Sequence, residues 1–75
     1  MINIALLGLG RIGLMHGKNL MRNKEFKLKY VYDINKKLTL KISKELKSIP
    51  IYNPSIAFKD REIDAVFIAS TTSTH

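Results

Sequence analysis

A glycine-rich turn follows an almost continuously apolar segment at the start of the chain. Residues 2–7 read Ile-Asn-Ile-Ala-Leu-Leu, the pattern of a strand that is covered on both faces. The next six residues are Gly8-Leu9-Gly10-Arg11-Ile12-Gly13, and a helix is expected from Arg11 to about Asn23. A buried strand that leads through a tight turn into a helix is typical of an α/β fold built around a parallel sheet.

The same alternation of strand and helix continues along the chain. Residues 26–32 alternate in polarity and carry aromatic and β-branched types, which predicts a second strand. A helix is expected over 35–48, with one apolar face made of Leu38, Ile42, Leu46 and Ile49. Pro50 should stop that helix. The remaining expected elements are a minimal edge strand at Ile51-Tyr52, a short helix opened by Asn53-Pro54 and reaching about Phe58, and a strand over 64–69.

The order β-α-β-α-β-α-β predicts one half of a doubly wound Rossmann fold. Right-handed crossovers make its sheet parallel, with strand order 3-2-1-4. The last strand is then an unprotected edge, with apolar surface around it. We therefore expect self-association, or pairing with a missing remainder of the protein.

Each glycine of the turn has a separate physical role. Gly8 permits the tight turn, Gly10 lets a pyrophosphate approach the backbone, and Gly13 lets helix and strand pack closely. Backbone N–H groups near Arg11 and Ile12 face an anion at the positive end of the helix dipole. An acidic residue follows 20 positions after the last glycine, which completes the pattern of a dinucleotide site. The alternative is a glycine-rich turn without a ligand.

That acidic residue, Asp33, closes the second strand. A carboxylate at this place accepts hydrogen bonds from the adenosine ribose hydroxyls and repels a 2′-phosphate, which favours NAD over NADP. Lys36 and Lys37 follow closely and would offset the repulsion. A second interpretation, compatible with the first, makes Asp33 the N-cap of the next helix.

Further candidates follow the fourth strand, at the ligand edge of the sheet. They are Ser70, Thr71, Ser73 and His75, and an ordinary solvated loop is the alternative. His16, within the first helix, is interpreted as a packing residue. Because the chain has neither metal-ligand spacing nor a catalytic triad pattern, no catalytic residue and no metal site are assigned.

Composition excludes several classes of protein. The chain has no cysteine, and no apolar run approaches the roughly 20 residues of a membrane span. The start of the chain lacks the features of a signal peptide, so we expect a cytoplasmic protein. The net charge of +7 is interpreted mainly as a solvated lysine surface. Nucleic-acid binding is not expected, because a recognition helix and an aromatic stacking platform are missing.

Over its whole length the chain resembles the start of the glucose–fructose oxidoreductase and inositol dehydrogenase family. The resemblance rests on residues 4–13 with His16, on Val31-Tyr32-Asp33, and on residues 63–75. The glycine motif is common to many dehydrogenases, and its pairing with the last segment is much more specific. Thr72 departs from the family, which often has proline in this loop.

Members of this family are NAD(P)-dependent oxidoreductases of sugars, polyols and related compounds. The resemblance implies NAD as cofactor, with Ser70, Thr71, Ser73 and His75 along the path from adenosine to nicotinamide. Residues 1–75 would be the N-terminal part of the NAD(P)-binding domain, while the family's catalytic residues and substrate domain would lie beyond residue 75. We therefore expect cofactor binding without turnover by this chain alone. The alternative is a non-catalytic nucleotide-binding or sensing module that works with a partner chain.

Overall fold

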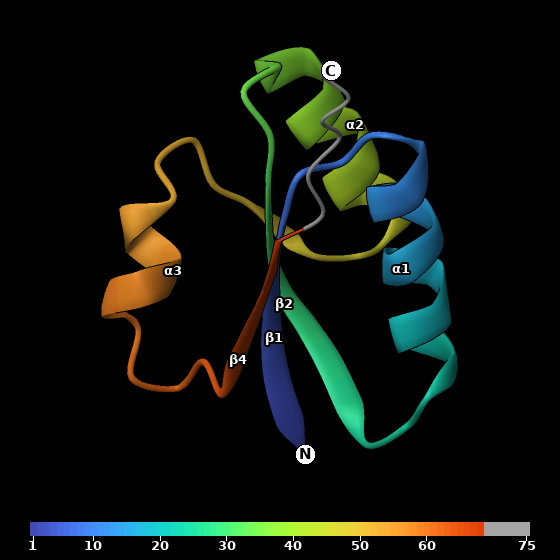
Figure 1. The fold of residues 1–75 in the computed structure, drawn as a ribbon, viewed down its shortest axis with the longest axis vertical. Coiled ribbons are helices and arrows are strands. Elements are labelled where there is room, and N and C mark those ends of the chain that lie inside the picture. The colour runs from blue at the N-terminus through green and yellow to red at the C-terminus, as the bar shows by residue number, and fades with distance from the viewer. Residues whose placement is uncertain (69–75) are drawn as a thin grey trace.

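The computed structural model describes residues 1–68, except for the side chains of residues 11–14 and 16. Its strands form one parallel sheet in the order β3-β2-β1-β4, which confirms the predicted fold class. The strands are β1 (Ile2–Leu7), β2 (Phe26–Tyr32), β3 (Ile49–Pro50) and β4 (Ala65–Ile68). The helices are α1 (Arg11–Arg22), α2 (Lys36–Glu45) and α3 (Ser55–Lys59). Helices α1 and α2 cover one face of the sheet, and α3 covers the other (Figure 1).

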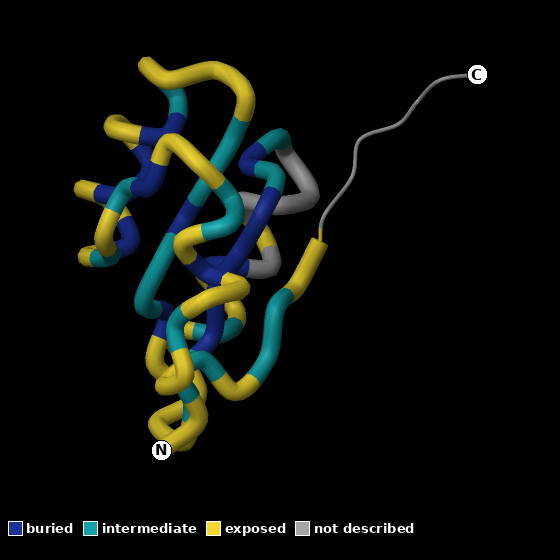
Figure 2. Tube along the Cα trace, turned by 90° about the vertical axis from the view of Figure 1, so that its left-hand side faces the viewer, coloured by how far each residue is buried: buried dark blue, intermediate teal, exposed yellow. Residues whose placement is uncertain are grey.

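The central strand β1 divides the core into two parts. Ile4 and Leu6 belong to a large cluster on the face of α1 and α2, whereas Ala5 belongs to a small cluster on the face of α3. Successive side chains of a strand point to opposite faces, and this accounts for the division. Figure 2 shows the buried residues concentrated along this strand and the segments beside it. The large cluster is completed by Leu9, Leu28, Val31, Ile42 and Leu46.

Helix α1 packs against the core at a glycine. Gly17 is buried, while Met15 and Met21 are exposed. A Cβ atom at Gly17 would lie 2.6 Å from Leu46 Cδ1 and 3.3 Å from Leu6 Cδ2. Both distances are shorter than ordinary carbon contacts of 3.5–4.0 Å. The absence of a side chain at Gly17 therefore lets α1 approach both β1 and the end of α2.

Strand β2 contains a bulge that breaks its regular alternation. Ile4 pairs with Leu28 and Ala5 pairs with Tyr30, so Lys29 has no partner on β1. As a result, Leu28 packs in the large cluster and Tyr30 packs against the small cluster on the opposite face. Without the extra residue, Leu28 and Tyr30 would share one face.

The end of α2 corrects three sequence-based expectations. The helix stops at Glu45 rather than at residue 48, because Lys47 turns into the left-handed region (φ 52°) and Ser48 N donates to Ser43 O at 2.9 Å. Ile49 is half exposed and does not extend the apolar helix face. Pro50 lies in β3 and does not stop the helix. A proline is tolerated there because β3 is an edge strand, where one missing N–H donor does little harm.

The later elements differ slightly from their expected bounds. Strand β3 precedes the predicted Ile51-Tyr52, and Ile51 is buried after it, with its N–H donating to Val31 O at 3.0 Å. Helix α3 begins at Ser55, where Asn53 Oδ1 accepts from the Ser55 amide at 3.0 Å. Strand β4 lies at the edge of the described sheet, and its last residues, Phe67 and Ile68, are exposed as expected. Self-association at this edge stays a prediction.

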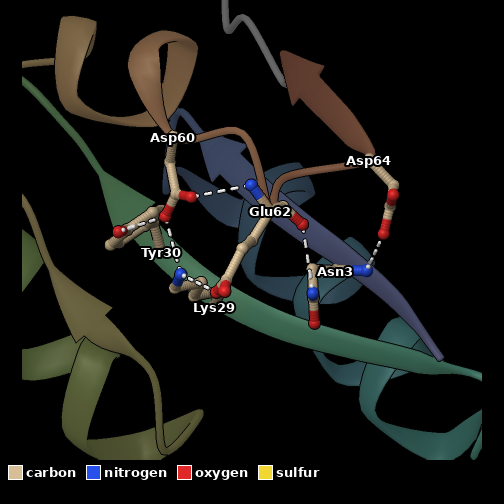
Figure 3. Close-up of polar contacts among 6 residues, drawn as sticks. All are labelled: Asn3, Lys29, Tyr30, Asp60, Glu62 and Asp64. Atoms are coloured by element: carbon tan, nitrogen blue, oxygen red, sulfur yellow. Dashed lines mark hydrogen bonds and ion pairs between the residues drawn. The ribbon is translucent and has the colours of Figure 1, made fainter.

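A polar cluster fastens the segment between α3 and β4 to the sheet (Figure 3). Lys29 Nζ lies 2.6 Å from Asp60 Oδ2 and 3.1 Å from Glu62 Oε1. Tyr30 donates its hydroxyl to the same Asp60 oxygen at 2.6 Å, and the Glu62 amide donates to Asp60 Oδ1 at 2.8 Å. We call Lys29, Tyr30, Asp60 and Glu62 the Asp60 cluster. Two members of the cluster, Lys29 and Tyr30, belong to β2. The bulge at Lys29 places both of their side chains on the face of the sheet that α3 covers.

Hydrogen bonding within this cluster changes the pKa values of its members. Bonds from Lys29, Tyr30 and the Glu62 amide stabilise the Asp60 carboxylate and lower its pKa from 3.8 to about 2. The two carboxylates raise the pKa of Lys29 above its usual range. The hydrogen bond to Asp60 and partial burial raise the pKa of Tyr30.

These shifts predict a stability plateau between about pH 4 and pH 10. A depressed carboxyl pKa contributes stability that is present above the unfolded pKa of 3.8 and is lost as the pH falls toward 2. The raised pKa values of Tyr30 and Lys29 contribute stability that is present below about 10 and is lost as the pH rises further. Urea unfolding followed by circular dichroism from pH 2 to pH 11 measures both limits.

The acid limit is assigned to Asp60 by comparing two variants. Asp60→Asn should be less stable at pH 7 and should lose much less further stability between pH 4 and pH 2 than the wild type. Glu45→Gln, which changes an exposed carboxylate on α2, should keep the wild-type loss. Equal acid sensitivity in Asp60→Asn and the wild type would contradict this assignment.

Candidate functional site at the carboxyl edge of the sheet

The glycine turn lies where β1 and β2 end, at the carboxyl edge of the sheet. Gly8 has a φ of 99°, in the left-handed region that glycine adopts without steric cost. Its amide donates to Tyr32 O at 2.7 Å and so continues the pairing of β1 with β2. Leu9 follows with its side chain buried in the large cluster, which anchors the turn. The backbone conformation at position 8 therefore favours glycine, as the sequence predicts.

Asp33 connects the glycine turn to the end of β2. Its Oδ2 accepts a hydrogen bond from the Leu9 amide at 2.8 Å. Its Oδ1 accepts from the Asn35 amide at 2.9 Å. A carboxylate oxygen has two acceptor positions, so each oxygen keeps capacity for one further donor. Asp33 is partly buried, and its carboxylate is thus held rigidly while remaining available to a ligand hydroxyl.

The two long helices that start at this edge differ in how their first turns are capped. In α2, Asn35 is the N-cap, and its Oδ1 accepts from the Leu38 amide at 3.1 Å. The suggestion that Asp33 is the N-cap is therefore wrong, because the cap requires the residue directly before the helix. In α1 the cap position is Gly10, which has no side chain to accept a bond, and residues 11–13 carry no acidic group. The start of α1 is thus suited to an anionic group of a ligand.

Thr39 supports the backbone of Asp33, a role that no sequence pattern predicted. It is fully buried in α2, and its hydroxyl contacts the backbone of Asp33. The buried face of α2 includes Thr39, Ile42, Ser43 and Leu46, which are spaced as one helical stripe. A count of apolar residues alone finds Leu38, Ile42 and Leu46 and passes over both hydroxyl side chains.

The other predicted site residues are placed only in part. Arg11, Ile12 and Gly13 form the first turn of α1, directly after the glycine turn, and their side chains lie outside what the structure describes. Ser70, Thr71, Ser73 and His75 lie outside the described residues, as does the side chain of His16. Their roles stay predictions.

One apolar side chain beside Asp33 is almost fully open. Ile34 is 86% exposed, the largest exposure of any apolar side chain that the structure describes. An exposed isoleucine next to a carboxylate held by hydrogen bonds provides an apolar contact and a polar acceptor at one place. No sequence pattern singles out Ile34, because a single apolar residue between a strand and a helix has no periodicity.

Lys36 and Lys37 face a different part of the surface. With Leu40 and Tyr52 they line an open hollow of about 420 Å³ on the outside of α2. Leu40 is exposed and belongs to the lining of this hollow rather than to the core. Among the residues whose side chains the structure describes, neither Leu9 nor Asp33 lines this hollow.

Two negative findings apply to the residues that the structure describes. Among the side chains of residues 1–68 that the structure describes, which leave out His16, no group of three or more histidine, aspartate or glutamate residues is arranged to hold a metal ion. Within the same range, every helix is too short or too polar to cross a bilayer.

A parallel 3-2-1-4 sheet, a glycine turn at the end of β1 and a carboxylate at the end of β2 define the dinucleotide-binding class of Rossmann folds. A family model described as "Oxidoreductase family, NAD-binding Rossmann fold" matches residues 2–75. The chain belongs to this family, Gfo/Idh/MocA, which confirms the resemblance read from the sequence.

Individual proteins of known identity agree with this assignment. Over 75 residues the chain is 31% identical to myo-inositol 2-dehydrogenase of Thermotoga maritima, covering 99% of this chain and 22% of that protein. The crystal structure of a myo-inositol dehydrogenase from Corynebacterium glutamicum matches with a TM-score of 0.86 and 31% identity, over 100% of this chain and 22% of that one. The chain thus spans about 22% of the length of these relatives.

A third similar structure supports the fold alone. GenD2 from gentamicin A biosynthesis, solved in complex with NAD, matches with a TM-score of 0.89 at 20% identity, over 99% of this chain and 21% of that one. The described sheet and helices therefore have the same arrangement as about a fifth of that longer chain.

Proposed function

We propose that this chain binds NAD(H) at the carboxyl edge of β1 and β2, as the N-terminal part of the cofactor domain of an oxidoreductase. The observation that supports this most directly is the 2.8 Å hydrogen bond from the Leu9 amide to Asp33. It joins the segment suited to phosphate and the carboxylate suited to ribose into one rigid unit. Two parts of one ligand can then be bound at a set distance without ordering the protein first.

The parts of the cofactor are assigned by chemistry. The pyrophosphate lies against Gly10 and the first turn of α1, where backbone N–H groups near Arg11 and Ile12 donate to it. The adenosine ribose donates its hydroxyls to the free acceptor positions of Asp33. The adenine ring packs on the exposed side chain of Ile34. Gly13 keeps the start of α1 close to β1.

Asp33 favours NAD over NADP. The 2′-phosphate of NADP would bring a second negative charge against the carboxylate, and this repulsion weakens binding. Lys36 and Lys37, the cations that follow Asp33 in sequence, line the hollow on the outside of α2. The two cations would offset part of that repulsion, as their nearness to Asp33 in sequence predicts.

The names of the relatives support a proposal for the substrate class. Two of them are named as myo-inositol dehydrogenases, and we infer an oxidoreductase of a sugar, polyol or related compound. When bound, the nicotinamide ring of the cofactor accepts or donates the hydride. Ser70, Thr71, Ser73 and His75 contribute to the path toward that ring. The alternative of a non-catalytic sensing module is less well supported, because the matching family consists of oxidoreductases.

Gly10→Val tests the phosphate part of the site. Gly10 has an extended backbone (φ −66°, ψ −171°), which valine adopts without strain, so the fold should survive. The branched side chain would occupy the space of the pyrophosphate, and NADH binding measured by isothermal titration calorimetry should be lost. Equal affinity in the variant and the wild type would remove the glycine turn from the site.

Asp33→Ser tests the choice of cofactor. Serine keeps a hydrogen-bonding group and removes the negative charge, so the preference for NAD over NADP should fall by about tenfold or more. Calorimetric titration of both cofactors gives this ratio. Glu45→Ser is the matched control, because it removes an exposed carboxylate from the far end of α2 and should leave the ratio unchanged. A wild-type chain that prefers NADP would contradict the role assigned to Asp33.

A further inference from the structure

We propose that Thr39 is a positioning residue that determines cofactor selectivity by holding the backbone of Asp33. The inference rests on the proposed function, and it adds to that function a buried group that does not touch the cofactor. Thr39 belongs to α2, one turn after the cap residue Asn35, and 0% of it is exposed.

The hydroxyl of Thr39 bonds to both sides of the Asp33 backbone. Thr39 Oγ1 accepts from the Asp33 amide at 2.9 Å. The same hydroxyl lies 3.1 Å from Asp33 O and 3.1 Å from Asn35 O, so its single proton is shared between these two carbonyls. Asn35 O also accepts from the Thr39 amide at 3.0 Å. The Thr39 hydroxyl thus links α2 to the backbone of Asp33.

This link constrains the direction of the Asp33 carboxylate. The Asp33 amide donates a hydrogen bond to the Thr39 hydroxyl. The two carboxylate oxygens of Asp33 accept hydrogen bonds from the amides of Leu9 and Asn35. With backbone and side chain both restrained, the free acceptor positions of Asp33 keep one direction relative to the glycine turn. Charge discrimination against a 2′-phosphate depends on that direction, because an aspartate free to rotate could turn away from the phosphate.

Three substitutions separate the hydroxyl of Thr39 from its shape. Thr39→Val keeps the volume and loses the hydroxyl, leaving the partly buried Asp33 amide without this acceptor. Thr39→Ala also removes the hydroxyl. Because alanine has the highest helix propensity, this variant tests the same loss if valine disturbs the helix. Thr39→Ser keeps the hydroxyl and should rescue the wild-type behaviour. Ser43→Ala is the matched control. Ser43 lies one turn after Thr39 in α2, and its buried hydroxyl donates to Leu40 O.

The measurement is the ratio of NAD to NADP affinity for each variant of the chain, by calorimetric titration. We expect the ratio to fall by up to about tenfold in Thr39→Val and Thr39→Ala, as for the loss of one neutral hydrogen bond to the backbone. Thr39→Ser and Ser43→Ala should keep the wild-type ratio. Exchange of the Asp33 amide proton, followed by nuclear magnetic resonance, should be faster in the valine and alanine variants only.

Failure of this inference and failure of the proposed function give different results. A wild-type ratio in both Thr39→Val and Thr39→Ala would overturn the role of Thr39 while leaving cofactor binding intact. A merely structural role would lower the affinities for NAD and NADP by the same factor and leave the ratio unmoved. A wild-type chain that binds neither cofactor would overturn the proposed function, and the inference with it.

Discussion

The hydrogen bond between the Leu9 amide and the Asp33 carboxylate is the contact on which the site depends. It joins the turn after β1 to the end of β2, two segments that are 24 positions apart in the sequence. Leu9 is anchored by its buried side chain, and the Asp33 backbone is anchored by Thr39. A charge-assisted bond between two anchored groups varies little in length and direction. The site is therefore formed by the packing of the sheet before any ligand arrives.

The packing around β1 allows this edge to form. Gly17 lets α1 lie close to Leu6 and Leu46, so the start of the helix stays close to the glycine turn. On the opposite face, the bulge at Lys29 supplies a cation and a phenol to the Asp60 cluster, which fastens the segment before β4 (Figure 3). The two faces use different means, close apolar contact on one and hydrogen bonds on the other, to hold a sheet with a very small core.

Most of the fold could be predicted from residue patterns. The bounds of β1 and β2 were predicted correctly, because runs of apolar and β-branched residues interrupted by glycine report directly on buried strands. The end of α2 was predicted wrongly, because a non-glycine residue in the left-handed region, Lys47, has no sequence signature. The bulge at Lys29 was missed for a similar reason, since it depends on pairing with β1 and not on local sequence.

The site was less predictable than the fold. Gly8 and Asp33 were identified by their spacing, which is a physical requirement of phosphate and ribose binding. Thr39 and Ile34 were not, because Thr39 is a polar residue in an otherwise apolar stripe and Ile34 lies between two elements. Their importance appears only when α2 is placed beside Asp33. A motif can therefore name the residues that face a ligand, whereas the residues that hold them in place require the structure.

The central claim is that the glycine turn and Asp33 together form the cofactor site. It is tested most directly by titrating the ¹⁵N-labelled chain with NADH and following each backbone amide by nuclear magnetic resonance. The account predicts that the amides of Leu9, Gly10 and Asp33 shift together with one dissociation constant, while those of the Asp60 cluster stay in place. Shifts confined to the hollow lined by Lys36, Lys37, Leu40 and Tyr52 would contradict the account and place the ligand on the outside of α2.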